Sequence, residues 1–369
     1  MIGSTSRRGG KTRLACSLIS KFNSQCEIFG IKITTIHDSR SGCPHGRSGC
    51  GVCAELDGRY CITEETDNKA DKDTCKMLAA GASRVFWVRV LRAHLEDAIT
   101  ALLDIIGRNT VSICESNSLR RVVEPGVFVM VEASSGSRKT SAQEVSQYVD
   151  RNIFYDGSRF DIEFDEIGLA GGRWSVKLNA TAIVVAGGAS RRMGEDKSML
   201  PVGNKPMIEF IVNQLRPNFE EIIISANDPG KYAFLGLKVV SDEIAGRGPL
   251  VGIASALKAS ANEANFVTAC DIPEIDMALV RQMLRQSCDV DAVVPRTGPS
   301  QHEPLFAVYK KNCIAAIDAA LLSGNNRVID SLSRCNVKYF DLPDKQMLKN
   351  INTMDEYLEF VRRQVNAAV

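Results

Sequence analysis

The architecture of the C-terminal half is indicated most strongly by residues 182–197, which read AIVVAGGASRRMGEDK. A short β-branched run leads directly into paired glycines, as it does at the ligand-binding edge of a doubly wound sheet. Because glycine has no Cβ, backbone N–H groups there can approach a triphosphate closely. Arg192 and Lys197 would neutralise phosphate charge, and a lysine suits a transferring phosphate group. The alternative is a Gly-rich turn with solvated basic residues, and a glycine pair taken alone would favour that alternative.

A second apolar run, Phe266–Ala269, is followed by Cys270 and Asp271. This order places a carboxylate at the C-terminal end of a buried strand, where α/β sheets bind ligands. Carboxylate and phosphate oxygens are the ligands that Mg²⁺ prefers, so Asp271 is a candidate Mg²⁺ ligand. A turn or helix-cap role is the alternative. Gly248 begins a further loop-to-helix segment that could contact a nucleotide or its acceptor, or simply place Pro249 in a first helical turn.

Composition limits the classes of protein to consider. The chain has 369 residues, 44% of them apolar, which is enough for two domains with their own cores. The formal net charge is +1 and no basic run occurs, which argues against nucleic acid as a partner. No apolar run approaches the roughly 20 residues of a membrane span, and the start lacks a signal-peptide pattern. We therefore expect a cytoplasmic protein without a membrane partner.

Short β-branched runs alternate with helical stretches along the whole chain, which predicts parallel sheets with crossover helices. The expected fold class is α/β, with two Rossmann-like doubly wound domains covering residues 1–170 and 179–369. Their boundary is placed in the Gly-containing segment Ile167–Lys177. The expected strands of the first half are Glu27–Ile36, Arg84–Val90, Thr110–Cys114 and Gly126–Val131. The expected helices are Lys11–Phe22, Lys72–Ala80, Ala93–Ile106 and Ser141–Val149, and the second half opens with the strand Ala180–Val185.

The C-terminal half resembles the molybdenum cofactor guanylyltransferase (MobA-type) family. The resemblance rests on pieces that occur in the family's order over nearly all of residues 179–369: Ala186-Gly187-Gly188, Arg192 to Lys197, Gly248 to Ile253, Cys270 to Pro273, Glu303-Pro304-Leu305 and Asn350 to Thr353. It implies a Mg²⁺-dependent nucleotidyltransferase that joins GMP from GTP to the terminal phosphate of molybdopterin, releasing pyrophosphate. Partners of that reaction would include GTP, the molybdenum cofactor, and molybdenum-enzyme apoproteins or other proteins of cofactor biosynthesis.

The resemblance also implies a role for individual residues. Lys197 would stabilise the α-phosphate under attack, and Arg192 and Asp271 would complete the catalytic set. Asp271 would hold Mg²⁺, with Asn352 as a second, weaker metal or phosphate contact. The nucleotide would be bound by the remaining residues of the set: Ala186, Gly187, Gly188, Asn227, Asp242 and Gly248. Cytidylyl transfer to the same cofactor, and nucleotidyl transfer to a sugar phosphate, stay open as alternatives.

The N-terminal half carries Gly10, Lys11 and Thr12 before a predicted helix, which is the end of a phosphate-binding P-loop. Thr5 stands where the standard spacing has glycine, and almost no strand is expected before the loop. Over Gly3–Asp156 this half resembles the P-loop GTPase-like (MobB-type) accessory proteins of the same pathway. The resemblance implies that Lys11 contacts phosphate, and that Thr12 and Glu115 serve Mg²⁺. A cofactor-binding module without hydrolysis is the alternative.

Five of the twelve cysteines cluster, and four of them are Cys43, Cys50, Cys53 and Cys61. A Cys-x-x-Cys pair with flanking cysteines suits a tetrahedral thiolate site for Zn²⁺ or an iron–sulfur cluster. Reduced cysteines on a loose loop are the alternative. The choice between zinc and iron–sulfur is left open, and the fifth cysteine or a nearby histidine could replace one ligand: Cys75, His37 or His45.

Overall fold

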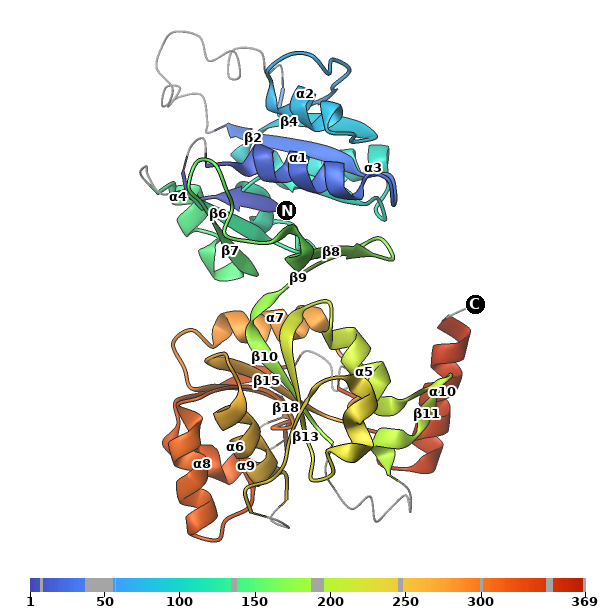
Figure 1. Ribbon diagram of the computed structural model, residues 1–369. Helices are drawn as coiled ribbons and strands as arrows, with labels where there is room; N and C mark the ends of the chain where they lie inside the picture. Colours follow the sequence, from blue (N-terminus) through green and yellow to red (C-terminus); the bar gives the residue numbers. More distant parts are fainter. Residues whose placement is uncertain are drawn as a thin grey trace. The chain divides into compact units, whose positions relative to one another are not determined.

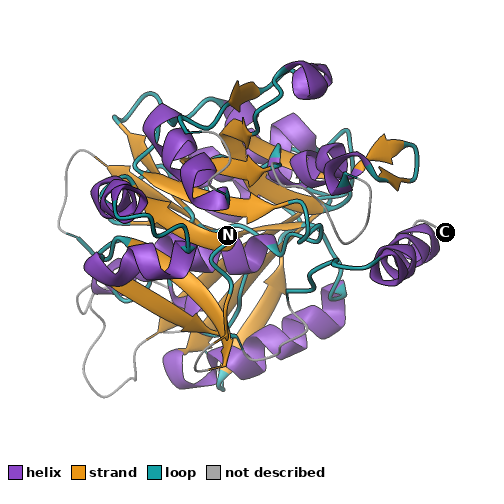
Figure 2. Ribbon diagram, turned by 90° about the horizontal axis from the view of Figure 1, so that it is seen from below, coloured by secondary structure: helices purple, strands orange, loops and turns teal. Residues whose placement is uncertain are grey.

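The computed structural model describes residues 1–6, 9–36, 56, 58–133, 138–186, 196–244, 248–298, 301–342 and 348–367. The chain divides into two compact units, Met1–Val176 and Lys177–Val369, each with its own sheet (Figure 1). Helices lie beside the strands in both units (Figure 2). No helix within the described ranges combines the length and apolar character needed to cross a membrane.

The N-terminal unit is built on a seven-stranded sheet in the order β3-β4-β2-β5-β1-β6-β7. Neighbouring strands of this sheet are parallel, except that β3 runs antiparallel to β4 at one edge. The length of the polar, Gly- and Cys-rich stretch Asp38–Asn68, between the first and second expected strands, predicts a functional loop, and Tyr60–Glu64 within it forms β3. The strands are β1 (Ile2–Ser4), β2 (Phe29–Ile36), β3 (Tyr60–Glu64), β4 (Arg84–Leu91), β5 (Ser112–Glu115), β6 (Val129–Ala133) and β7 (Arg151–Tyr155).

A strand precedes the predicted phosphate loop, contrary to the expectation that this strand is nearly absent. β1 is only three residues long, but it lies inside the sheet and pairs with both β5 and β6. All three of its residues are buried. A strand this short has too little sequence to show periodicity, so its position depends on the two neighbouring strands.

Helices cover both faces of this sheet. Gly30 lies against Met77 of α2, whereas the next residue, Ile31, belongs to the core cluster that contains Leu95 and Leu102 of α3. Since successive strand residues point to opposite faces, α2 and α3 lie on opposite sides. The helices are α1 (Lys11–Phe22), α2 (Asp73–Ala79), α3 (Leu95–Ile106) and α4 (Thr140–Gln143). The predicted helix Ser141–Val149 is thus a shorter α4 followed by a 3-10 turn.

A separate hairpin closes the N-terminal unit. Its strands, β8 (Ile167–Ala170) and β9 (Arg173–Val176), are joined by Gly171 and Gly172, whose φ angles are 55° and 72°. Two consecutive positive φ values are what a tight two-residue hairpin turn requires, and glycine adopts them without strain. The Trp174 indole N–H donates to the Ser112 carbonyl oxygen at 3.2 Å, which ties the hairpin to the sheet.

The C-terminal unit is built on a mixed sheet in the order β14-β13-β10-β15-β18-β16-β17, with β19 paired to β16. β14, β13, β10 and β15 are mutually parallel. The strands are β10 (Leu178–Val185), β13 (Phe219–Ser225), β14 (Lys238–Val240), β15 (Ala264–Ala269), β16 (Ala292–Gly298), β17 (Gln301–His302), β18 (Phe306–Lys310) and β19 (Val337–Asp341). A small hairpin is formed by β11 (Pro201–Val202) and β12 (Lys205–Pro206).

The expectation of parallel sheets with crossover helices does not hold at β18, which runs antiparallel to both β15 and β16. β17 and β18 both run antiparallel to β16, and only residues 299–300 separate β16 from β17 in the sequence. A parallel crossover needs a dozen or more residues, so the chain reverses after β16. The mixed α/β class holds, and the four-strand parallel portion carries the glycine loop.

Both faces of this sheet are covered. Helices α6, α8 and α9 share one core cluster with residues of β10, β15 and β16. On the strands themselves nearly every residue is buried, as expected for parallel strands with helices on both sides. The helices are α5 (Met207–Leu215), α6 (Pro249–Ala259), α7 (Met277–Gln286), α8 (Cys313–Leu322), α9 (Val328–Ser331) and α10 (Met354–Ala367).

Candidate active site

The glycine loop and Asp271 leave the sheet at the same edge. β10 and β15 are adjacent and parallel, with Val185 opposite Ala269 in register. Ala186 follows the first strand, and Cys270 and Asp271 follow the second. Carboxyl ends of neighbouring parallel strands open into the crevice where this class of sheet binds ligands.

One residue of the C-terminal segment joins Lys197 to Asp271. The Lys197 ammonium donates to the Ile351 carbonyl oxygen at 2.7 Å. The Ile351 N–H in turn donates to the Asp271 carbonyl oxygen, also at 2.7 Å. Both predicted catalytic residues therefore contact the main chain of Ile351, although they lie 74 positions apart in the sequence.

The Asp271 side chain is prepared to bind a cation. Its Oδ1 atom is buried and has no hydrogen-bond partner among the described residues. Burial raises the pKa of Asp271, and the nearby Lys197 charge opposes that rise. A buried carboxylate oxygen without a donor is costly unless a cation or donor arrives, so this atom is a suitable Mg²⁺ ligand. Burial raises the pKa of the adjacent Cys270 to about 12, so that thiol is not a nucleophile at neutral pH.

Two further oxygen-bearing side chains accompany Asp271. Asn350 also has a buried Oδ1 without a partner in the described part of the chain. Glu303 hydrogen-bonds to Asn350, and burial, together with the Asp271 charge, raises the pKa of Glu303. Both residues lie in motifs noted in the sequence, but only Asn352 was selected as the second contact. The Asn352 backbone N–H donates to Glu356 at 2.6 Å.

Asn227 and Asp242, predicted to contact guanosine, bind each other. The Asn227 amide donates to Asp242 Oδ2 at 2.8 Å, and the Asp242 N–H donates back to Asn227 Oδ1 at 2.8 Å. A Cβ on Gly252 of α6 would lie 2.4 Å from the Ser225 hydroxyl and 3.1 Å from Asp242 Oδ1. Glycine at 252 thus lets the start of α6, entered through Gly248 at φ 79°, approach these strand ends closely.

Tyr232 connects the residues on either side of the glycine loop. Its hydroxyl donates to the Ala186 carbonyl oxygen at 3.0 Å and lies 2.9 Å from the Ser198 hydroxyl. Asp196, which caps the turn containing Lys197, forms an ion pair with Lys231. The contacts of Tyr232 and Lys231 were not predicted from the sequence, because both residues lie more than 30 positions after the loop residues that they contact. The remaining predicted loop residues lie outside the described ranges: Gly187, Gly188 and Arg192.

The N-terminal unit gathers its predicted phosphate residues at the carboxyl end of β1. Gly10 has φ 83° and precedes α1, which begins at Lys11. The Thr12 hydroxyl is hydrogen-bonded to both Glu115 and Asp73. Desolvation lowers the pKa of Lys11, and the Glu115 charge opposes this effect. Desolvation also raises the pKa of Glu115, whose Oε1 is buried without a partner in the described residues.

An ion pair that the sequence did not reveal lies beside this group. Lys32 of β2 contacts Asp73 at the start of α2. The Asp73 carboxylate therefore contacts both the Lys32 ammonium and the Thr12 hydroxyl. Neither residue was selected from the sequence, because no short spacing links position 32 to position 73.

The cysteine cluster lies mostly outside the described residues, which exclude Cys43, Cys50 and Cys53. Cys61 lies in β3, where its sulfur accepts from Arg89 at 3.5 Å and lies 3.7 Å from the Thr63 hydroxyl. Cys75, a possible substitute ligand, is only 1% exposed in α2. Within the described ranges no group of three His, Cys, Asp or Glu residues is placed to hold a metal ion. The metal prediction for this segment remains untested.

An α/β unit with a glycine loop, a lysine and an acidic residue at one edge of a parallel sheet portion has the architecture of a nucleotidyltransferase. Residues 182–335 match the family model described as "MobA-like NTP transferase domain". A probable molybdenum cofactor guanylyltransferase of Pelotomaculum thermopropionicum is 44% identical over 175 residues, which are 47% of this chain and 84% of that protein. The chain therefore belongs, through its C-terminal unit, to the molybdenum cofactor guanylyltransferase family.

Other relatives match over a similar share of the chain. A probable molybdenum cofactor guanylyltransferase of Carboxydothermus hydrogenoformans is 35% identical over 191 residues, covering 50% of this chain and 96% of that protein. Among solved structures, molybdopterin-guanine dinucleotide biosynthesis protein A of Archaeoglobus fulgidus is 24% identical, with a TM-score of 0.43. That match covers 51% of this chain and 98% of the other.

Proposed function

We propose that the C-terminal unit transfers GMP from GTP to the terminal phosphate of molybdopterin and releases pyrophosphate. The observation that supports this most directly is that Ile351 contacts both the Lys197 ammonium and the main chain of Asp271, whose buried side-chain Oδ1 has no partner among the described residues, in a domain of the guanylyltransferase family. A phosphate oxygen of the acceptor attacks the α-phosphorus of GTP in line, so no covalent enzyme intermediate is needed. Catalysis then consists mainly of positioning and charge neutralisation.

Separate residues of the C-terminal unit are proposed to stabilise the α-phosphate, hold Mg²⁺ and bind the nucleotide. Lys197 exchanges the Ile351 carbonyl oxygen for the α-phosphate and stabilises the charge that develops there. Asp271 would hold Mg²⁺, with Asn350 and Asn352 as candidates for a second oxygen ligand. When bound, Mg²⁺ supplies charge neutralisation at the phosphates. Gly187, Gly188 and Arg192 are proposed to contact the triphosphate, and Asn227 and Asp242 the guanosine.

GTP is expected to be the preferred donor. The Asn227–Asp242 pair offers fixed polar groups at the strand ends, and such groups discriminate strongly between bases that do and do not satisfy them. We expect at least about tenfold more product with GTP than with CTP. The measurement is incubation of the full chain with molybdopterin, Mg²⁺ and each nucleoside triphosphate, with products identified by mass. Equal or reversed preference would assign the chain to cytidylyl transfer.

A second function is proposed for the N-terminal unit, which would bind a Mg²⁺–nucleoside triphosphate through Lys11, Thr12 and Glu115. It is favoured by the desolvated Lys11 ammonium beside the buried, partly unsatisfied Glu115 carboxylate. A phosphate at this position would compensate the lysine, and a cation would compensate the glutamate. Whether nucleotide is hydrolysed there is a separate question from binding.

Lys11→Ala is expected to remove one of two binding sites for a non-hydrolysable GTP analogue, lowering its affinity by about tenfold or more. GMP transfer should be unchanged, because Lys11 belongs to the other unit. Calorimetric titration of the full chain measures both sites. Lys21→Ala is the matched control, because Lys21 lies in the last turn of α1 and pairs with Asp165. One site in the wild type, or two in Lys11→Ala, would refute the proposal.

The cysteine-rich segment is proposed to bind one metal centre, either Zn²⁺ or an iron–sulfur cluster. Glycines at 42, 46, 49 and 51 let a short loop bring sulfurs around one ion. Anaerobically prepared protein should contain stoichiometric zinc or iron by elemental analysis. Cys50→Ser/Cys53→Ser should lose it, and Cys288→Ser, which changes an exposed cysteine of the other unit, should not. Freely titrating thiols without metal would reduce the segment to an ordinary loop.

A further inference from the structure

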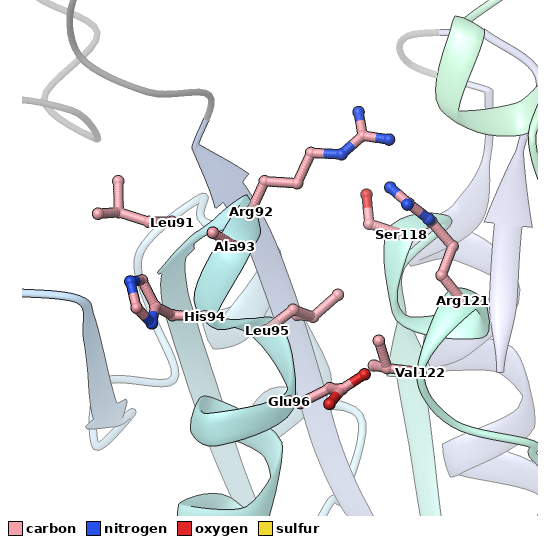
Figure 3. Close-up of a pocket in the computed structure, with 9 residues that line it drawn as sticks. All are labelled: Leu91, Arg92, Ala93, His94, Leu95, Glu96, Ser118, Arg121 and Val122. Atoms are coloured by element: carbon pink, nitrogen blue, oxygen red, sulfur yellow. The ribbon is translucent and has the colours of Figure 1, made fainter.

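A cavity of about 770 Å³ lies in the N-terminal unit, where β4 ends and α3 begins. Its other wall is the 3-10 helix that follows β5. Figure 3 shows the side chains of Arg92 and Arg121 extending toward each other from these two walls, with Ser118 between them. None of the residues that line it belongs to the Lys11 group, so the cavity is distinct from the phosphate loop.

The two arginines share one carboxylate. An Arg92 nitrogen donates to both oxygens of Glu144, at 2.9 and 3.0 Å, and an Arg121 nitrogen lies 3.7 Å from the same group. Each guanidinium carries several N–H donors, so one carboxylate leaves donors of both arginines available. Two positive charges against one negative charge give this end of the cavity a net positive charge.

Glu144 occupies the position that an anionic ligand would take. Carboxylate and phosphate present oxygens to a guanidinium fork in the same way, but phosphate carries more charge and a third oxygen. The three side chains are all about one-third exposed or more, and ion pairs of that exposure contribute little to stability. Releasing Glu144 to solvent therefore costs little.

The rest of the cavity lining offers both apolar surface and hydrogen-bond acceptors. Leu95 and Val122 supply apolar surface, and the Glu96 carboxylate offers acceptors for ring N–H groups. The volume falls within the usual range for small-molecule sites. We propose that this cavity binds a phosphate monoester that carries a planar, N–H-bearing ring of purine size, with Arg92 and Arg121 on the phosphate. The ligand displaces Glu144 from the arginines.

The test uses GMP as the probe and the full chain carrying Lys11→Ala and Lys197→Ala, which weaken the two proposed nucleotide sites. Calorimetric titration at low ionic strength should find one GMP site, with inorganic phosphate and guanosine each binding more weakly. Arg121→Ala should lower GMP affinity by about tenfold or more. Arg138→Ala is the matched control, because it removes an exposed Arg–Glu pair outside the cavity and should have no effect.

Glu144→Gln distinguishes a binding site from a structural clamp. If Glu144 competes with the ligand, removing its charge should raise GMP affinity severalfold even where the melting temperature falls. If the Arg–Glu cluster serves only to hold α4, affinity should not change in either Arg121→Ala or Glu144→Gln. That outcome, or the absence of GMP binding in the parent, would overturn the proposal. Because the readout is binding in a transfer-deficient background, its failure leaves the proposed transferase function unaffected.

Discussion

Lys197→Ala is expected to lower the rate of GMP transfer by about a thousandfold while the protein stays folded. The ammonium lies at the active edge of the sheet, and its loss removes compensation for charge that develops only in the transition state. kcat should therefore fall much more than the affinity for GTP does. Single-turnover transfer from GTP to molybdopterin, with product quantified by mass, measures the effect.

Lys205→Ala is the matched control for that variant. Lys205 carries the same charge, but it is exposed and pairs with Glu209 one helical turn away. It should retain wild-type activity. Thermal melting of both variants checks the fold. A Lys197→Ala rate within about threefold of wild type would show that another group stabilises the α-phosphate.

Asp271→Asn should lower the rate of GMP transfer at ordinary Mg²⁺ concentrations by about a hundredfold or more. The substitution keeps the size of the side chain but replaces an unpartnered, buried carboxylate oxygen with a neutral amide, which binds Mg²⁺ poorly. Titration with Mn²⁺, followed by electron paramagnetic resonance, gives a readout independent of activity. Normal Mn²⁺ binding and normal turnover would mean that a different carboxylate holds the ion.

Asp276→Asn provides the control, since Asp276 lies five residues further on and caps α7 through the Ala278 and Leu279 amides. Asparagine caps a helix about as well as aspartate, so little should change. Asn350→Ala and Asn352→Ala, measured in the same titration, separate the two candidates for the second ligand. A larger loss in Asn350→Ala would agree with its buried, unpartnered oxygen.

Much of the local structure follows from the sequence. α1 has the predicted bounds, because its inward side chains (Leu14, Leu18 and Phe22) repeat at helical spacing after two glycines. β10 and β15 were recognised as short apolar runs that end at a loop or a carboxylate. α4 was predicted too long because Ala142, Val145 and Val149 keep helical spacing, whereas only Thr140–Gln143 is α-helical and Ser146–Tyr148 forms a 3-10 turn. β18 was not among the strands predicted from the sequence, and it runs antiparallel because the chain reverses between β16 and β17.

The site residues that directly follow a strand could be predicted from the sequence. Asp271 and the glycine loop both follow recognisable strands, and neighbouring parallel strands end at one edge. The contacts made by Tyr232, Glu303 and Asn350 were not predictable, because each depends on residues distant in the chain coming together. Such pairs are set by tertiary packing and leave no local spacing in the sequence.

The link through Ile351 has a consequence for how this site tolerates change. Both contacts are made by main-chain atoms, the N–H toward Asp271 and the carbonyl oxygen toward Lys197. The distance between the Lys197 ammonium and the Asp271 main chain is therefore set by the backbone of residue 351 and not by its side chain. Substitutions at 351 that preserve packing leave the spacing intact, whereas a proline, which has no N–H, or a one-residue insertion or deletion shifts it. Indels just before α10 are therefore active-site mutations, although they fall far along the chain from Lys197.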